Sequence, residues 1–141
     1  MSFGTAVKTV FSKYATFSGR ARRSEFWFWA LFLAIVWVVV SIVAGPMMAS
    51  GIDMQTGQVG GSYFAGTALY AIVGLAFLLP NLAVTVRRLH DQDKPGVLVI
   101  LAFIPVANIV LLVFMFLEGT RGPNQFGPDP KAVDAPAAPQ V

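Results

Sequence analysis

The sequence predicts an all-α membrane protein. Hydrophobic residues make up 56% of its 141 residues and charged residues only 12%, whereas a soluble globular domain carries about 25% charged residues. The charges also avoid three windows, each close to the roughly 20 residues that a helix needs to cross a bilayer core of about 30 Å. Three transmembrane helices are therefore expected at about residues 26–48, 63–86 and 97–117, after an amphipathic interfacial helix at about 3–17.

The N-terminal helix is predicted from apolar residues at helical spacing. They are Phe3, Val7, Val10, Phe11, Tyr14 and Phe17, while Lys8 and Lys13 fall between them. Two interpretations fit this pattern equally well. The helix either lies in the membrane interface, with aromatic rings at the acyl boundary and lysines at the headgroups, or packs on the other helices. Ser18-Gly19 ends the pattern.

The first expected span opens with Trp27, Phe28 and Trp29, which is typical of an interfacial aromatic belt. Residues 49–62 then form a polar, glycine-rich stretch without lysine or arginine. That composition is typical of a flexible connector.

The second and third spans each contain a proline and a nearby asparagine, namely Pro80 with Asn81 and Pro105 with Asn108. Proline removes a backbone donor and kinks a helix. The favoured interpretation is two kinked helices that bond to each other through their amides. The alternative is a polar site or pathway at the breaks.

The chain after the third span is rich in turn-forming residues, and Asn124, Gly127 and Asp129 form the core of a C-terminal turn motif. Residues 131–141 are rich in alanine and proline and are predicted to be a disordered tail. We therefore expect one integral membrane domain at 1–130.

Two charged clusters flank the predicted spans. The first contains Arg20, Arg22, Arg23 and Glu25, and the second contains Arg87, Arg88, His90 and Asp91. Because positive loops stay in the cytoplasm, the N-terminus and the 87–96 loop are predicted to be cytoplasmic. Three spans would then leave the C-terminus outside. If the stretch broken at Pro105 is re-entrant, the C-terminus is cytoplasmic instead.

Both clusters lie at the same predicted membrane face, so we expect them to meet. Glu25 would pair with Arg87 or Arg88, and Asp91 with an arginine of the first cluster. The remaining arginines would bind an anion, most simply the phosphates of lipid headgroups. The simpler alternative is a helix end whose charges satisfy one another.

The same composition argues against several kinds of site. The chain has no cysteine and one histidine, so it lacks the ligands of most transition-metal sites. We predict no metal, no cofactor and no catalytic residue. The net charge of +3 comes largely from residues that flank the spans, which favours membrane lipids over nucleic acid as a partner.

Three motifs together resemble a known family. They are FSGRARRSEFW at 17–27, RRLHD at 87–91 and GPNQFGPDP at 122–130. In this order they resemble the bacterial proteins known as domain of unknown function 805, the YhaH/YhaI-like small inner-membrane proteins. The resemblance covers about residues 3–130. Relatives often have a small polar residue after the His-Asp pair, where this chain has Gln92-Asp93-Lys94. The resemblance implies a multi-pass protein of the bacterial inner membrane and supplies no activity.

The favoured function is a non-enzymatic membrane module whose charged cluster binds anionic lipid headgroups or a partner protein. The first alternative is an oligomeric small transporter or channel subunit that uses the Pro/Asn breaks. A membrane-bound enzyme is the least favoured alternative. A homo-oligomer is compatible with each of them.

Overall fold

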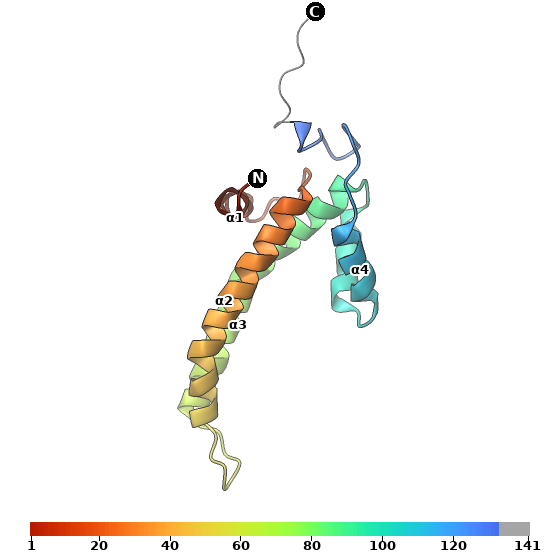
Figure 1. Ribbon diagram of the computed structural model, residues 1–141. Coiled ribbons are helices and arrows are strands. Elements are labelled where there is room, and N and C mark those ends of the chain that lie inside the picture. The colour runs from red at the N-terminus through yellow and green to blue at the C-terminus, as the bar shows by residue number, and fades with distance from the viewer. Residues whose placement is uncertain (133–141) are drawn as a thin grey trace, which may run out of the picture. The chain divides into compact units, whose positions relative to one another are not determined.

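The computed structural model describes residues 1–132, and within them it is all-helical with no named strand. Its helices are α1 (Phe3–Ser12), α2 (Arg23–Ser50), α3 (Gly61–Asp91), the 3₁₀ helix η1 (Gly96–Phe103) and α4 (Ala107–Phe116). Figure 1 traces them along the chain. The contacts divide the chain into two compact units, one of residues 1–29 with the chain from 80 onward and one of residues 30–79. From residue 133 on, the predicted disordered tail lies outside the described residues.

Helix α1 is shorter than the predicted segment 3–17. The Ser2 hydroxyl caps its N-terminus by accepting from the Thr5 backbone N–H at 3.2 Å. Ala6 and Val10 are its buried residues, and no later residue of 11–17 is buried. Because a short helix depends on packing for its stability, the helix ends at Ser12, where its buried face ends.

Helices α2 and α3 extend beyond the predicted bounds of 26–48 and 63–86. They are the two helices in the described chain that are long and apolar enough to cross a membrane, by length and composition. Helix α3 continues for five residues past Val86, to Asp91, because its charged side chains find partners there, as described below. It also runs through Pro80 without ending.

In the unit of residues 30–79, α2 and α3 lie side by side (Figure 1). The rings of Trp37 and Tyr70 stack with centroids 6.1 Å apart, and the Tyr70 and Ser41 hydroxyls are 3.0 Å apart. Gly66 permits the close approach, because a Cβ there would lie 2.9 Å from the Ala44 carbonyl oxygen.

The connector between α2 and α3 is a structured turn. The Asp53 carboxylate accepts backbone N–H groups from Gln55 at 2.8 Å and Thr56 at 3.3 Å. Ile52 and Val59 form an antiparallel bridge across it. Gly57 supplies the positive φ of 72° that the turn requires.

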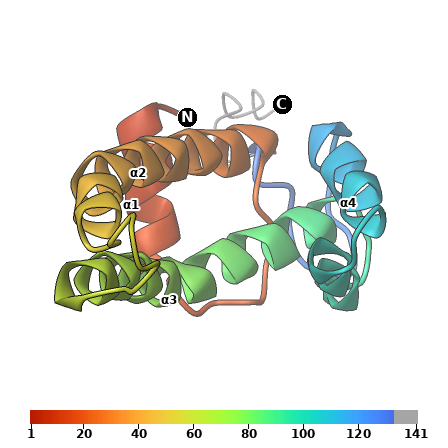
Figure 2. The same cartoon turned by 90° about the horizontal axis from the view of Figure 1, so that it is seen from below.

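The third apolar stretch departs from the prediction. Instead of one helix over 97–117, the chain forms η1 and α4, with a break at residues 104–106. Pro105 has no N–H to continue a helix, and Val106 reverses the chain direction with a φ of 68°. The two short helices pack on each other, and both views draw them side by side (Figures 1 and 2).

Candidate functional site

The two charged clusters meet, and every residue of both lies in the unit of residues 1–29 and 80–132. Asp91, at the end of α3, accepts from Arg20 Nε at 3.0 Å and also pairs with Arg88. These three side chains are buried. The expected pairing of Asp91 with an arginine of the first cluster is confirmed, and Arg20 is that arginine.

The second ion pair joins Arg87 to Glu25 at 2.5 Å. Glu25 lies in the first turn of α2, where the helix dipole also favours a negative charge. Of the two arginines considered for Glu25, the geometry selects Arg87. A backbone hydrogen bond from the Ala21 N–H to the Arg87 carbonyl, at 2.9 Å, also joins the chain just before α2 to α3 beside this pair.

The arginines also bind the chain that follows α4. Arg20 donates to the carbonyls of Thr120 at 2.5 Å and Gly122 at 2.7 Å. Arg22 donates to the Pro130 carbonyl at 3.2 Å. These bonds hold the C-terminal segment beside the end of α3. The Thr120 N–H also donates to the Asp91 carbonyl, at 2.7 Å, at the same place.

Side chains from elsewhere in the site cap the C-terminus of α4. The last carbonyls of a helix have no partner within it. Here each of four consecutive carbonyls, those of residues 114–117, accepts a side-chain donor. The donors, in that order, are Gln92, Trp27, Arg23 and Arg88.

The cap contains two residues whose role was not predicted from the sequence. Trp27 was assigned to an aromatic belt, but its indole N–H donates to the Met115 carbonyl at 3.3 Å. Gln92 stood out only as a departure from the family pattern, yet it caps α4. The sequence carries no signal for either role, because the acceptors are backbone carbonyls.

The C-terminal turn motif also joins the site. The Asn124 amide donates to the His90 carbonyl at 2.9 Å and to the Thr120 hydroxyl at 2.7 Å. The Phe126 ring stacks on His90 with centroids 3.9 Å apart. Gly127, with φ at 136°, closes the turn through a bridge with Asn124.

His90 and Asp129 are each fixed by a backbone contact. His90 Nδ1 lies 3.1 Å from the Gly19 carbonyl, which can only accept, so Nδ1 is the donor. The Asp129 carboxylate accepts the backbone N–H groups of Lys131 and Gly122, at 2.9 and 3.0 Å. These bonds stabilise its charged form and lower the pKa of Asp129 below its ordinary value.

The helix-break residues do not join this site. Pro80 is buried within α3, whereas Asn81, Pro105 and Asn108 are exposed. Within residues 1–132, neither asparagine amide has a hydrogen-bond partner, so the expected amide contact between the two helices is absent. Thr85 instead donates to the Asn81 carbonyl of its own helix at 2.7 Å.

The buried part of the site carries excess positive charge. Three arginines (Arg20, Arg87 and Arg88) face two carboxylates (Glu25 and Asp91), and all five are buried. In the described structure, Arg87 Nε, Arg87 Nη2 and Arg88 Nε have no hydrogen-bond partner. Because both carboxylates are held by guanidinium groups, this arrangement binds and positions chain segments.

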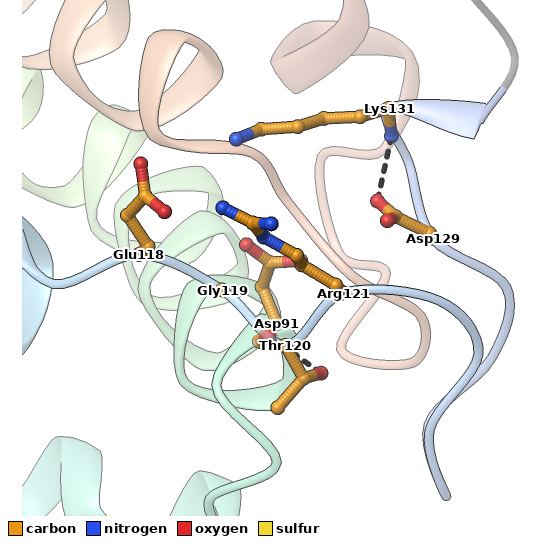
Figure 3. A pocket seen from close by; sticks show the side chains of 7 residues that line it. All are labelled: Asp91, Glu118, Gly119, Thr120, Arg121, Asp129 and Lys131. Carbon is orange, nitrogen blue, oxygen red and sulfur yellow. Dashed lines mark hydrogen bonds between the residues drawn. The ribbon is translucent and has the colours of Figure 1, made fainter. Parts of the chain in front are cut away.

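Two cavities adjoin the cluster. One, of about 310 Å³, lies against Asp91 and the segment after α4. Figure 3 shows Glu118, Arg121 and Lys131 extending toward its space. The other, a cleft of about 600 Å³, lies between α1 and the C-terminal turn, and its charged lining residues are Lys13, Arg20, Arg22, Glu25 and Asp129. Over residues 1–132, no group of three or more His, Cys, Asp or Glu residues is arranged to hold a metal ion.

Known proteins resemble this chain over most of its length. It is 38% identical over 124 residues to "Inner membrane protein YhaI" of Escherichia coli K12, an alignment that covers 87% of this chain and 92% of the relative. It is 37% identical to "Inner membrane protein YhaH" of the same organism, with 86% and 93% covered. "Uncharacterized protein YiiR" is 29% identical, with 84% and 88% covered. No solved structure matches this chain.

The family described as "Protein of unknown function (DUF805)" matches residues 14–128. That range contains the two charged clusters and nearly all of the C-terminal turn motif, the three sequence features that carried the resemblance. The chain therefore belongs to the DUF805 family.

Proposed function

We propose that this protein is a non-enzymatic module of the bacterial inner membrane that binds anionic lipid headgroups at its cytoplasmic face. Two relatives are named inner membrane proteins, and α2 and α3 are long enough to cross a bilayer. Lysine and arginine number five at residues 1–23 and three at 87–96, with none at 49–62. This asymmetry supports a cytoplasmic N-terminus.

The third apolar stretch is proposed to be re-entrant, so that it enters and leaves the membrane at the cytoplasmic face. The support is the cap on α4, whose donors come from the start of α2 and the end of α3. Arg20 holds the following segment at the same place through Thr120 and Gly122. The sequence favoured a third crossing with an external C-terminus, whereas these contacts favour a cytoplasmic C-terminal turn.

Single cysteines test this topology cleanly, because the natural chain has none. Gln55→Cys, in the α2–α3 connector, should react with a membrane-impermeant maleimide only from the periplasmic side. Ser18→Cys and Gln125→Cys should react with it only after the inner membrane is permeabilised, which exposes the cytoplasmic face. Labelling of Gln125→Cys from the periplasm would show a third crossing and refute the re-entrant arrangement.

The observation that carries the lipid-binding proposal is the cleft beside α1. Lys13 and Arg22 line it together with Arg20, whose guanidinium is buried and already bound to Asp91, so Lys13 and Arg22 are the cations proposed to bind lipid. The two carboxylates of the cleft already have partners, Glu25 in Arg87 and Asp129 in backbone N–H groups. Lysine and arginine bind phosphate oxygens at a membrane surface.

The outer surface of α1 supports the same proposal. Phe3, Phe11, Tyr14 and Phe17 are partly exposed on α1 and the residues just after it, close in sequence to the exposed Lys8. The Phe3 and Phe11 rings also contact Phe28 and Trp29 of α2. Exposed aromatic rings beside lysines suit the boundary between acyl chains and headgroups. Ala6 and Val10 are buried at the same time, so both interpretations of the amphipathic segment contribute: it packs on the protein and presents its other face to lipid.

Lipid retention in a mild detergent tests the cleft by native mass spectrometry. The Lys13→Gln/Arg22→Gln double variant should lose bound phosphatidylglycerol or cardiolipin. The Lys94→Gln/Arg121→Gln double variant removes the same charge from residues outside the cleft and should retain it. Equal loss from both pairs would indicate general charge attraction, and no loss from either would refute the lipid site.

A further inference from the structure

The tip of the η1–α4 hairpin exposes polar groups. Val106 is 77% exposed and is a β-branched residue held at positive φ, which is an outlier conformation for such a residue. Its N–H has no acceptor within the described chain. The nearby Asn108 amide is exposed and has none either. The tip is therefore an incompletely satisfied part of an otherwise apolar hairpin.

This tip lies at the depth of Asn81. Arg88 bonds both Asp91, at the end of α3, and the Leu117 carbonyl, at the end of α4, which brings the two helix ends level. Asn81 precedes Asp91 by ten residues, and Asn108 precedes Leu117 by nine. At 1.5 Å per residue both amides lie about 14–15 Å from those ends, near the middle of a hydrocarbon core of about 30 Å.

Lipid cannot satisfy these groups. Irregular backbone at membrane depth occurs where protein or water covers it, and a polar side chain exposed to hydrocarbon is costly. The amides of Asn81 and Asn108 must then be covered by something other than acyl chains. A second copy suits them, because an amide carries both donors and an acceptor and is complementary to itself across a twofold axis.

We infer that this protein forms a homodimer in the membrane, in which the hairpin tip and Asn81 of one copy meet the same surface of the other. The amides of Asn81 and Asn108 bond across the interface. Exposed apolar side chains beside them, including Ile109 and Leu112, complete the contact. This inference rests on the re-entrant arrangement proposed above, because that arrangement sets the depth of the tip.

Association in nanodiscs tests the dimer. Fluorescence energy transfer between two labelled populations, measured over a series of lipid dilutions, should show that the wild-type chain associates. Asn81→Leu and Asn108→Leu should each weaken association by about 3- to 30-fold, the range that interhelical hydrogen bonds in membranes support. Thr67→Val is the control, because the Thr67 hydroxyl already donates to the Tyr63 carbonyl at 3.0 Å. A wild-type monomer, or variants that associate as the control does, would overturn the inference.

Disulfide trapping tests the same surface without removing the asparagines. Leu112 lies one turn after Asn108, on the same face of α4, whereas Val110 faces about 200° away. Both are similarly exposed, at 50% and 47%. Leu112→Cys should form a crosslinked dimer on oxidation in membranes, and Val110→Cys should not. Equal crosslinking at the two positions would refute the proposed face.

Cysteine labelling distinguishes a failure of the proposed dimer from a failure of the proposed re-entrant topology. If Gln125→Cys labels from the periplasm, the re-entrant arrangement fails and the tip depth with it. If Gln125→Cys labels from the cytoplasm and the wild type is monomeric, only the dimer fails. Labelling of Val106→Cys by an aqueous maleimide in intact membranes would place water at the tip, as a channel would, and would overturn coverage by a second copy.

Discussion

The Arg20 guanidinium lies 2.9 Å from the Asp91 carboxylate, although 71 positions separate the two residues along the chain. Both are buried, and the same guanidinium binds the carbonyls of Thr120 and Gly122. One side chain thus joins the segment before α2, the end of α3 and the chain after α4. Unlike a surface ion pair, which contributes little, this contact holds three distant segments of the unit together.

The Glu25–Arg87 pair should show strong coupling in a double-mutant cycle. Both side chains are at most 4% exposed, so Glu25→Gln alone leaves a buried charge and should lower the free energy of unfolding by about 3–5 kcal/mol. Combining it with Arg87→Gln should reveal a coupling energy of about 0.5–3 kcal/mol. Unfolding in detergent measures it. A cycle of Glu25 with the exposed Lys8 is the additive control, and additivity for Glu25 with Arg87 would contradict the pair.

Gly119 should tolerate no side chain. A Cβ there would overlap the Asp91 carboxylate and lie 2.8 Å from the Asp91 carbonyl oxygen. We expect Gly119→Ala to destabilise the protein by about 1–3 kcal/mol, as measured by thermal unfolding in detergent. Gly45→Ala is the matched control, because nothing lies within 4 Å of a Cβ at that helical position. Similar melting curves for the two variants would count against the packing at Gly119.

The Asn124 amide should stabilise the C-terminal turn. It satisfies the His90 carbonyl and the Thr120 hydroxyl, and removing such a partner costs about 1–3 kcal/mol. Asn124→Ala should therefore speed hydrogen exchange at residues 120–128 in particular. Gln125→Ala changes the neighbouring exposed side chain and should leave exchange as in the wild type. Unchanged exchange in Asn124→Ala would mean that the turn does not depend on this amide.

Acid should weaken the C-terminal turn through Asp129. The pKa of its carboxylate is below the ordinary value of 3.8, because the N–H groups of Lys131 and Gly122 donate to it. A carboxylate whose pKa is lower in the folded state than in the unfolded state stabilises the fold at pH values above its unfolded-state pKa. That stabilisation is lost as the pH falls through the folded-state pKa.

The wild-type unfolding temperature should therefore fall more steeply than that of Asp129→Asn below about pH 4. Measuring both from pH 6 to pH 2 gives the comparison. Asp53, whose pKa is also lowered by backbone N–H groups, is present in both chains and contributes equally. Parallel curves for the two chains would rule out a contribution from Asp129.

The order of residues alone predicts the helical class, the approximate positions of α2 and α3, and the charged residues that meet in the site. The physical reason is local: α2 and α3 each contain a window of about 20 residues without a charge, and such windows appear directly in the order of residues. Complementary charge also made the meeting of the two clusters predictable, since each contains arginines and one carboxylate that needs a partner.

The pairing of each arginine with its acid is visible in the folded chain alone, because Arg87 and Arg88 are chemically identical and adjacent in sequence. The folded chain also shows how the third apolar stretch is divided into two short helices. Composition cannot distinguish a helix over 97–117 from two short helices, since both have the same hydropathy. The cap on α4 depends on donors from Trp27 and Gln92 to backbone carbonyls. Every residue has such a carbonyl, so only the folded geometry determines which of them is bound.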